Sequence, residues 1–86
     1  MIYVVTGCSG FIGFHVAKQL LKKNNFVIGI DNLNKYYDIR LKLDRLNILK
    51  NISKKFLFKK IDISKFQSLE KIFKNLKKFK VIHLAA

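Results

Sequence analysis

The amino-acid sequence predicts an α/β fold, a doubly wound parallel sheet of four strands in the order 3-2-1-4. Short apolar runs alternate with segments of helical spacing along the whole chain of 86 residues, an order typical of β-α-β crossovers. The connections between these segments are short, and right-handed crossovers then place the strands parallel to one another. A chain of this length supplies one core, so we expect one domain over residues 1–86.

The first half of the chain contains two expected strands and the helix between them. Residues 2–5 and 26–30 are apolar runs that suit strands buried on both faces. Residues 11–23 carry helical spacing. Their apolar stripe consists of Ile12, Val16 and Leu20. We expect this helix to stop at Asn24 and Asn25, because asparagine tolerates the left-handed conformation that closes helices.

The second half repeats the alternation of helix and strand. Residues 38–50 return to helical spacing, and residues 56–61 form an expected third strand that two lysines interrupt. Ser64 is the expected N-cap of the next helix, with Gln67 three residues later completing a capping box. The apolar side chains expected to point inward from that helix are Phe66, Leu69, Phe73 and Leu76. Residues 81–85 form the expected fourth strand.

The net charge of +13 is the strongest compositional feature, and two interpretations fit it. A basic excess of this size suits nucleic acid or an anionic surface. However, Lys, Ile, Phe and Asn are all abundant, which is typical of AT-rich codon usage, and the lysines form no single contiguous motif. We interpret the lysines as solvated faces and expect neither nucleic acid nor a membrane as a partner.

The cysteine count and the hydropathy bound the compartment. A single Cys excludes an internal disulfide and an all-cysteine metal site. No stretch supplies the ~20 mostly apolar residues that a membrane-spanning helix needs, and the apolar start of the chain lacks a basic region before it. We therefore expect a cytoplasmic protein without a metal site.

A glycine-rich segment joins the first expected strand to the first helix. Gly7 permits the sharp turn, Gly10 allows a pyrophosphate to approach the backbone, and Gly13 lets the helix pack tightly on the sheet. The helix N-terminus then offers unpaired N–H groups and a positive dipole end to phosphates. An ordinary glycine turn is the alternative, but the position at the first strand–helix junction favours a dinucleotide site. No Gly-Lys-Ser/Thr occurs, which excludes a P-loop.

An acidic residue stands at the end of the second expected strand. Asp31 follows Gly13 by 18 residues, where a carboxylate accepts hydrogen bonds from an adenosine ribose. The same carboxylate would repel a 2′-phosphate, and the nearest candidate counter-charge in the sequence is Lys35. The sequence therefore favours NAD over NADP.

Four ordered segments carry the motifs of a known family. They are Val5–Gly13, which is similar to a TGxxGFIG signature, the acidic strand end Ile30–Asn34, the segment Ile61–Ile63 and the last strand Val81–Ala86. In these motifs the chain resembles the extended short-chain dehydrogenase/reductases, and among them the nucleotide-sugar 4-epimerases, whose cofactor domain is Rossmann-like. The run Asp31–Asp38 with the following Leu41 and Lys42 resembles the UDP-glucuronate 4-epimerases more than the UDP-glucose 4-epimerases.

The resemblance implies NAD as the cofactor and a role for each motif. Besides the three glycines, the implied cofactor-binding residues are Phe11 and Ile12 at the pyrophosphate, Asp31 and Asn32 at the adenosine ribose, Asp62 and Ile63 at adenine, and Leu84, Ala85 and Ala86 near the nicotinamide. Core packing is an alternative role for Ile12, Ile63 and Leu84. For His15 and His83 we expect a satisfied core histidine and no catalytic role.

The catalytic pair of that family is missing. Its members use a Tyr-x-x-x-Lys pair, and none of the 3 tyrosines here is followed by Lys at that spacing. The resemblance implies an enzyme that interconverts UDP-glucuronate and UDP-galacturonate through transient oxidation at C4. We expect residues 1–86 to be its NAD-binding segment, with no catalytic residue and with the substrate domain absent.

A nucleotide sugar and a homodimeric partner are expected only for a full-length form. Two alternatives stay open for the chain itself. One is a non-catalytic dinucleotide-binding fragment of a truncated or degenerate gene. The other is a basic nucleic-acid-binding domain.

Overall fold

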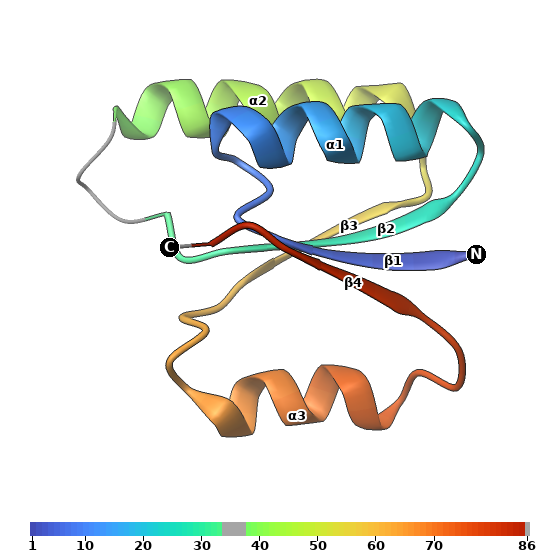
Figure 1. Ribbon diagram of the computed structural model, residues 1–86. Coiled ribbons are helices and arrows are strands. Elements are labelled where there is room, and N and C mark those ends of the chain that lie inside the picture. The colour runs from blue at the N-terminus through green and yellow to red at the C-terminus, as the bar shows by residue number, and fades with distance from the viewer. Residues whose placement is uncertain (34–37, 86) are drawn as a thin grey trace.

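The four strands form one parallel sheet in the order β3-β2-β1-β4, as the sequence predicts (Figure 1). The computed structural model describes residues 1–33 and 38–85. The strands are β1 (Ile2–Thr6), β2 (Phe26–Asp31), β3 (Phe56–Lys60) and β4 (Lys80–His83). The second strand runs one residue further than expected and the fourth starts earlier and ends earlier, so Asp31 is the last residue of β2, paired in register with Lys60.

The helices cover both faces of the sheet, which confirms the doubly wound arrangement. They are α1 (Phe11–Lys22), α2 (Ile39–Ile52) and α3 (Phe66–Lys74). Figure 1 shows α1 and α2 together on one face and α3 on the other. Within residues 1–33 and 38–85, no helix is long and apolar enough to span a bilayer.

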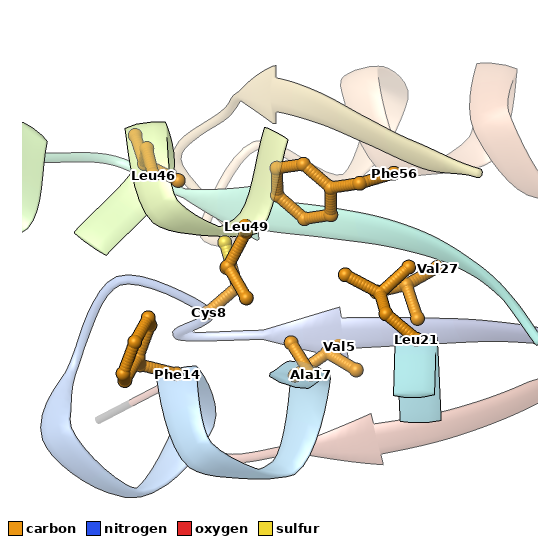
Figure 2. Packing of buried hydrophobic residues seen from close by; sticks show 9 residues of the cluster. All are labelled: Val5, Cys8, Phe14, Ala17, Leu21, Val27, Leu46, Leu49 and Phe56. Carbon is orange, nitrogen blue, oxygen red and sulfur yellow. The ribbon is translucent and has the colours of Figure 1, made fainter. Parts of the chain in front are cut away.

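The core lies between the sheet and the pair α1 and α2 (Figure 2). Its buried side chains are Val5, Cys8, Phe14, Ala17, Leu21, Val27, Leu46, Leu49 and Phe56. The packing is close enough that a Cβ at Gly29 would lie 2.7 Å from the Cys8 sulfur. Burying these apolar side chains is the main stabilising contribution, worth roughly 1.5–3 kcal/mol for each fully buried Val, Leu or Phe.

The end of α1 confirms one expectation, and its buried face differs from the stripe read off the sequence. Asn24 takes a left-handed φ of 68° just after Lys23, the C-cap of the helix. The face that packs on the sheet consists of Gly13, Phe14, Ala17 and Leu21. Ile12, from the expected apolar stripe, is 63% exposed. The small residues Gly13 and Ala17 decide the orientation, because they let the helix backbone approach the sheet.

The prediction of a capping box at the third helix is wrong. The N-cap of α3 is Lys65, and no side chain caps this helix. Ser64 instead donates from both its N–H and its hydroxyl to Asp62 Oδ1, at 3.0 and 2.8 Å. The serine hydroxyl therefore closes a local turn before the helix begins, which removes it from the cap.

The inward face of α3 is only half-buried. Leu69, Phe73 and Leu76 each keep intermediate exposure, and the ring of Phe73 stacks on that of Phe79 at 5.2 Å. The side chain of Phe66, expected on the same face, lies outside what the structure describes. The second face of the sheet is consequently covered less completely than the first.

Candidate functional site

An open cavity of about 830 Å³ lies at the carboxyl ends of the strands, the edge at which open α/β sheets bind ligands. Most residues that the sequence analysis singled out line this cavity. Those present are Gly7, Gly10, Phe11, Ile12, Asp31, Asn32, Asp62, Ile63, Leu84 and Ala85. Gly13 is buried and does not line the cavity, and Ala86 lies outside the described residues.

The glycine turn is required by the protein's own backbone. Gly7 has a left-handed φ of 72°, and a Cβ there would lie 3.0 Å from backbone atoms of Leu84 and Ala85. Gly13 allows the closest approach, because a Cβ at that position would lie 2.0 Å from the carbonyl oxygen of Gly7. A Cβ at Gly10 would meet only that same oxygen, at 3.3 Å. Packing within the chain thus explains Gly7 and Gly13 more fully than Gly10.

The N-terminus of α1 opens into the cavity without a cap. Its N-cap is Gly10, which has no side chain to bond the first turn, and no acidic residue lies in that turn. The first N–H that reaches a backbone acceptor is that of Phe14, which donates to the Gly10 carbonyl at 2.9 Å. The N–H groups of Phe11 and Ile12 precede it and have no intrahelical acceptor. This end of the helix presents free donors and a positive dipole end, which together suit an anion.

Asp31 is a buried carboxylate held from three directions. Asp31 is 6% exposed. Oδ2 accepts from the Ser9 N–H at 3.2 Å, and Oδ1 accepts from the Leu33 N–H at 2.8 Å. Lys42 Nζ lies 3.6 Å from Oδ1. These partners offset the cost of burying the charge and fix the carboxylate at the strand end.

Lys42 is a cavity residue to which the sequence assigned no role. It is only 7% exposed, and it is the cation nearest to Asp31 among the described residues, whereas Lys35, the expected counter-charge, lies outside them. A periodic signal could have found it, because Lys42 shares the buried face of α2 with Leu46 and Leu49. A lysine on the apolar stripe of a helix needs a buried partner.

A second cation from α2 reaches the glycine turn. Arg45 Nη1 donates to the carbonyl oxygen of Ser9 at 3.0 Å, and its guanidinium carbon lies 5.9 Å from the centroid of the Phe11 ring. Both Lys42 and Arg45 line the cavity. The cavity therefore combines two cations from α2 with the acidic groups Asp31 and Asp62.

The far end of the cavity, after β3, is exposed and carries a stabilised carboxylate. Asp62 accepts two hydrogen bonds from Ser64, one from the backbone N–H and one from the hydroxyl. These bonds, the backbone one most strongly, hold the pKa of the Asp62 carboxyl below its usual value. The Ile61 N–H donates to the Asp31 carbonyl at 3.1 Å, which joins this segment to the end of β2. Ile63 is half-buried here.

At the end of β4, Thr6 binds the segment that follows the strand. Its Oγ1 accepts from the N–H groups of Leu84 and Ala85 at 2.9 and 3.3 Å. Leu84 is 40% exposed and Ile12 is 63% exposed. This exposure excludes core packing as the role of either residue. These contacts hold the backbone of Leu84 and Ala85 beside Gly7, in the wall of the cavity.

His15 and His83 are both exposed. The prediction that they are buried core residues is therefore wrong. His83 is exposed on β4 and lies 2.7 Å from the Thr6 hydroxyl. His15 lies on the outer face of α1, where its ring meets those of Phe11 and Phe14 edge-on. Neither side chain lines the large cavity.

Cys8 is a core residue although it follows the glycine turn. It is fully buried, and burial together with the nearby Asp31 charge holds the pKa of its thiol well above the usual range. A neutral, inaccessible thiol is a poor nucleophile. Among the described residues, no three His, Cys, Asp or Glu side chains gather as a metal site would require.

Comparison with known proteins places the whole chain in one group. The family model described as GDP-mannose 4,6 dehydratase matches residues 4–86. The chain is 52% identical over 84 residues to a UDP-glucuronate 4-epimerase of Thermodesulfobacterium geofontis, covering 98% of this chain and 26% of that protein. It is 42% identical over 87 residues to Protein CapI of Staphylococcus aureus, covering 100% of this chain and 25% of that protein.

Solved structures agree with the sequence matches. The crystal structure of UDP-glucuronic acid 4-epimerase from Bacillus cereus with UDP-glucuronic acid and NAD matches with a TM-score of 0.84 and 34% identity, covering 100% of this chain and 26% of that one. A UDP-glucose 4-epimerase of Thermotoga maritima with UDP-glucose matches with a TM-score of 0.74 and 32% identity, covering 24% of its length. The chain thus spans about a quarter of the length of its relatives.

Proposed function

The chain belongs to the GDP-mannose 4,6 dehydratase family, and from that premise we propose that residues 1–86 form the NAD-binding segment of a nucleotide-sugar 4-epimerase that acts on UDP-glucuronate. The observation that carries the proposal is the meeting of the uncapped N-terminus of α1 with the buried Asp31 at one cavity. The helix N-terminus suits a pyrophosphate, and the Asp31 carboxylate suits a ribose with free hydroxyls. Relatives crystallised with NAD share this fold.

The residues present fit a dinucleotide from one end of the cavity to the other. Phe11 and Ile12 line the cavity, and their N–H groups have no intrahelical acceptor, which suits a pyrophosphate. Asp31 and Asn32 would hold the adenosine ribose, and the exposed Asp62 turn with Ile63 would border adenine. Leu84 and Ala85 would face the nicotinamide side, with Thr6 fixing their backbone.

The chain's own residues bind and orient the cofactor in this proposal. When bound, NAD supplies a reversible hydride acceptor. The glycine turn keeps side chains out of the path of the pyrophosphate, and Asp31 accepts hydrogen bonds from the ribose hydroxyls. No residue of the chain is assigned to proton transfer, because none of its tyrosines belongs to a Tyr-x-x-x-Lys pair.

Epimerisation at C4 is proposed for a form that also carries a substrate domain and that pair. A UDP-sugar is bound by the Bacillus cereus relative, and we propose the same class of substrate for such a form, together with a homodimeric assembly. The high identity to a UDP-glucuronate 4-epimerase favours this sugar over UDP-glucose.

Isothermal titration of the chain with NAD tests the cofactor assignment. We expect one NAD per chain, and we expect Asp31→Ala to weaken binding by about tenfold or more, the value of one or two hydrogen bonds to a charged group. Asp44→Ala is the matched control, because it removes the same charge from an exposed position of α2. Absence of NAD binding by a folded chain, or equal losses in the two variants, would contradict the proposal.

A further inference from the structure

Helix α2 holds the glycine turn through a side chain that the cofactor assignment does not use. Arg45 Nη1 donates to the Ser9 carbonyl oxygen at 3.0 Å, and the guanidinium lies over the Phe11 ring at 5.9 Å. Arg45 is half-buried, so the hydrogen bond is partly shielded from water. Ser9 is fully buried, and a buried carbonyl needs such a partner.

The hydrogen bond to Ser9 also fixes its neighbour Gly10. The carbonyl of Ser9 and the N–H of Gly10 belong to one planar peptide group and point in opposite directions. Arg45 bonds the carbonyl side, and the Gly10 N–H donates to the Gly7 carbonyl at 3.1 Å on the other side. The peptide is therefore held at both ends, and a rotation would break both bonds.

Gly10 is the N-cap of α1, so the orientation of this peptide sets how the first turn of the helix faces the cavity. The Ser9 N–H is held as well, by Asp31 Oδ2 at 3.2 Å. The backbone of Ser9 thus connects Arg45 with the carboxylate proposed for the ribose. Gly10 has no side chain that could fix the turn instead.

We propose that Arg45 is a positioning residue for the dinucleotide, which locks the Ser9–Gly10 peptide so that the first turn of α1 is ready for the pyrophosphate. This inference rests on the proposed NAD binding and deepens it. Arginine suits the role because its planar group bonds a carbonyl and stacks on an aromatic ring together. A lysine keeps the charge but lacks the planar group.

Amide hydrogen exchange in the ligand-free chain tests the lock directly. In Arg45→Met we expect the Gly10 N–H to exchange about tenfold faster or more, since the peptide is then held on one side only. Arg40→Met is the matched control, because Arg40 is an exposed arginine of the same helix, and Gly10 exchange should stay unchanged there. Unchanged Gly10 exchange in a folded Arg45→Met chain would overturn the proposal.

Ligand affinities separate positioning from general stability. We expect Arg45→Met to weaken NAD and ADP-ribose by about tenfold and to leave adenosine, which has no pyrophosphate, unchanged in an NMR titration. Arg45→Lys should weaken NAD as much as Arg45→Met does. Full NAD affinity in Arg45→Lys would show that the positive charge alone matters, and would overturn the role of the guanidinium. Equal losses for NAD and adenosine would also overturn the role.

The outcomes distinguish this inference from the proposed function. If the unmodified chain binds no NAD, the cofactor assignment fails, while Gly10 exchange still decides whether Arg45 locks the turn. If circular dichroism shows that Arg45→Met does not fold, Arg45→Lys carries the exchange test, because it keeps the stem and the charge. Gly10 exchange at the unmodified rate in Arg45→Lys would then overturn the proposal.

Discussion

The Thr6 hydroxyl lies 2.7 Å from Nδ1 of His83 and joins the ends of β1 and β4. The same Oγ1 accepts the N–H groups of Leu84 and Ala85. A hydroxyl has two acceptor sites and one proton, so with both sites used the proton goes to His83. One buried threonine thus orders the last strand end, beside the glycine turn.

Replacing Thr6 by valine should destabilise the chain by about 1–3 kcal/mol. Valine keeps the shape but removes the side-chain acceptor of the Leu84 and Ala85 N–H groups. The Leu84 N–H keeps the Thr6 backbone carbonyl, at 3.2 Å, as its remaining acceptor. The free energy of unfolding from urea titration measures the loss. Thr6→Ser is the control, because it keeps the hydroxyl and should lose clearly less. Equal stability of the valine variant and the unmodified chain would show that the three contacts contribute nothing.

NAD should bind about tenfold or more tightly than NADP, because a 2′-phosphate brings roughly two negative charges to Asp31. Asp31→Ala should narrow the gap, mainly by weakening NAD. Calorimetric titration with both cofactors measures the ratio. An NADP preference in the unmodified chain would mean that Asp31 does not lie at the ribose.

Lys42 should reduce the preference for NAD over NADP, because its ammonium lies 3.6 Å from Asp31 Oδ1 and partly offsets the negative charge that repels a 2′-phosphate. We therefore expect Lys42→Met to widen the ratio of NAD to NADP affinity, chiefly by weakening NADP. The same calorimetric titrations measure this. Lys50→Met, which removes an exposed lysine from the same helix, is the control and should leave the ratio unchanged. A narrower ratio in Lys42→Met would contradict the assignment of Lys42 as the counter-charge.

Ser64→Ala should raise the pKa of Asp62 toward its usual value, because the hydroxyl bond is one of the causes that lower it. A carboxyl whose pKa is depressed by folding adds stability above its unfolded pKa of ~3.9 and loses it as the pH falls through the lower folded value. Carbon-13 NMR titration of the Asp62 carboxyl checks the shift. Ser68→Ala, on α3, should leave this titration unchanged, and an unchanged Asp62 titration in Ser64→Ala would refute the cause.

Self-association should run through the β4 side of the sheet. On β4, Val81 is 47% exposed, and among the described residues β4 ends the sheet on that side. The opposite edge, β3, carries two exposed lysines, Lys59 and Lys60, against Lys80 alone on β4, and charges on an edge strand disfavour pairing. Analytical ultracentrifugation should therefore show less association for Val81→Lys than for Leu57→Lys on β3. The reverse order would contradict this assignment.

DNA binding should be weak and lost by moderate salt if the lysines are solvated faces. A purely electrostatic complex loses roughly 10³–10⁵ in affinity between 50 and 200 mM salt when 6–10 phosphates are contacted. Fluorescence anisotropy with two unrelated duplexes across that salt range measures the loss. Retention at the upper salt with a preference for one duplex would favour the nucleic-acid alternative.

The sequence alone determined those features that depend on local pattern. The alternation of apolar runs and helical spacing predicted the succession of strands and helices, and Gly7 and Asn24 both take the left-handed conformation that their residue types favour. Asp31 stands at the end of β2, as its position after an apolar run predicts. Such features need only the chain neighbours, because period and backbone preference act over a few residues.

The tertiary structure decided what depends on contacts between distant segments. It turned Gly13 and Ala17 of α1 to the sheet in place of the Ile12 stripe, because close approach favours small residues. It also brought Lys42 to Asp31 at the end of β2, and it brought Arg45 to Ser9, 36 residues away in the chain. No local pattern encodes these distances, since they follow from how α2 packs beside α1 on a shared sheet.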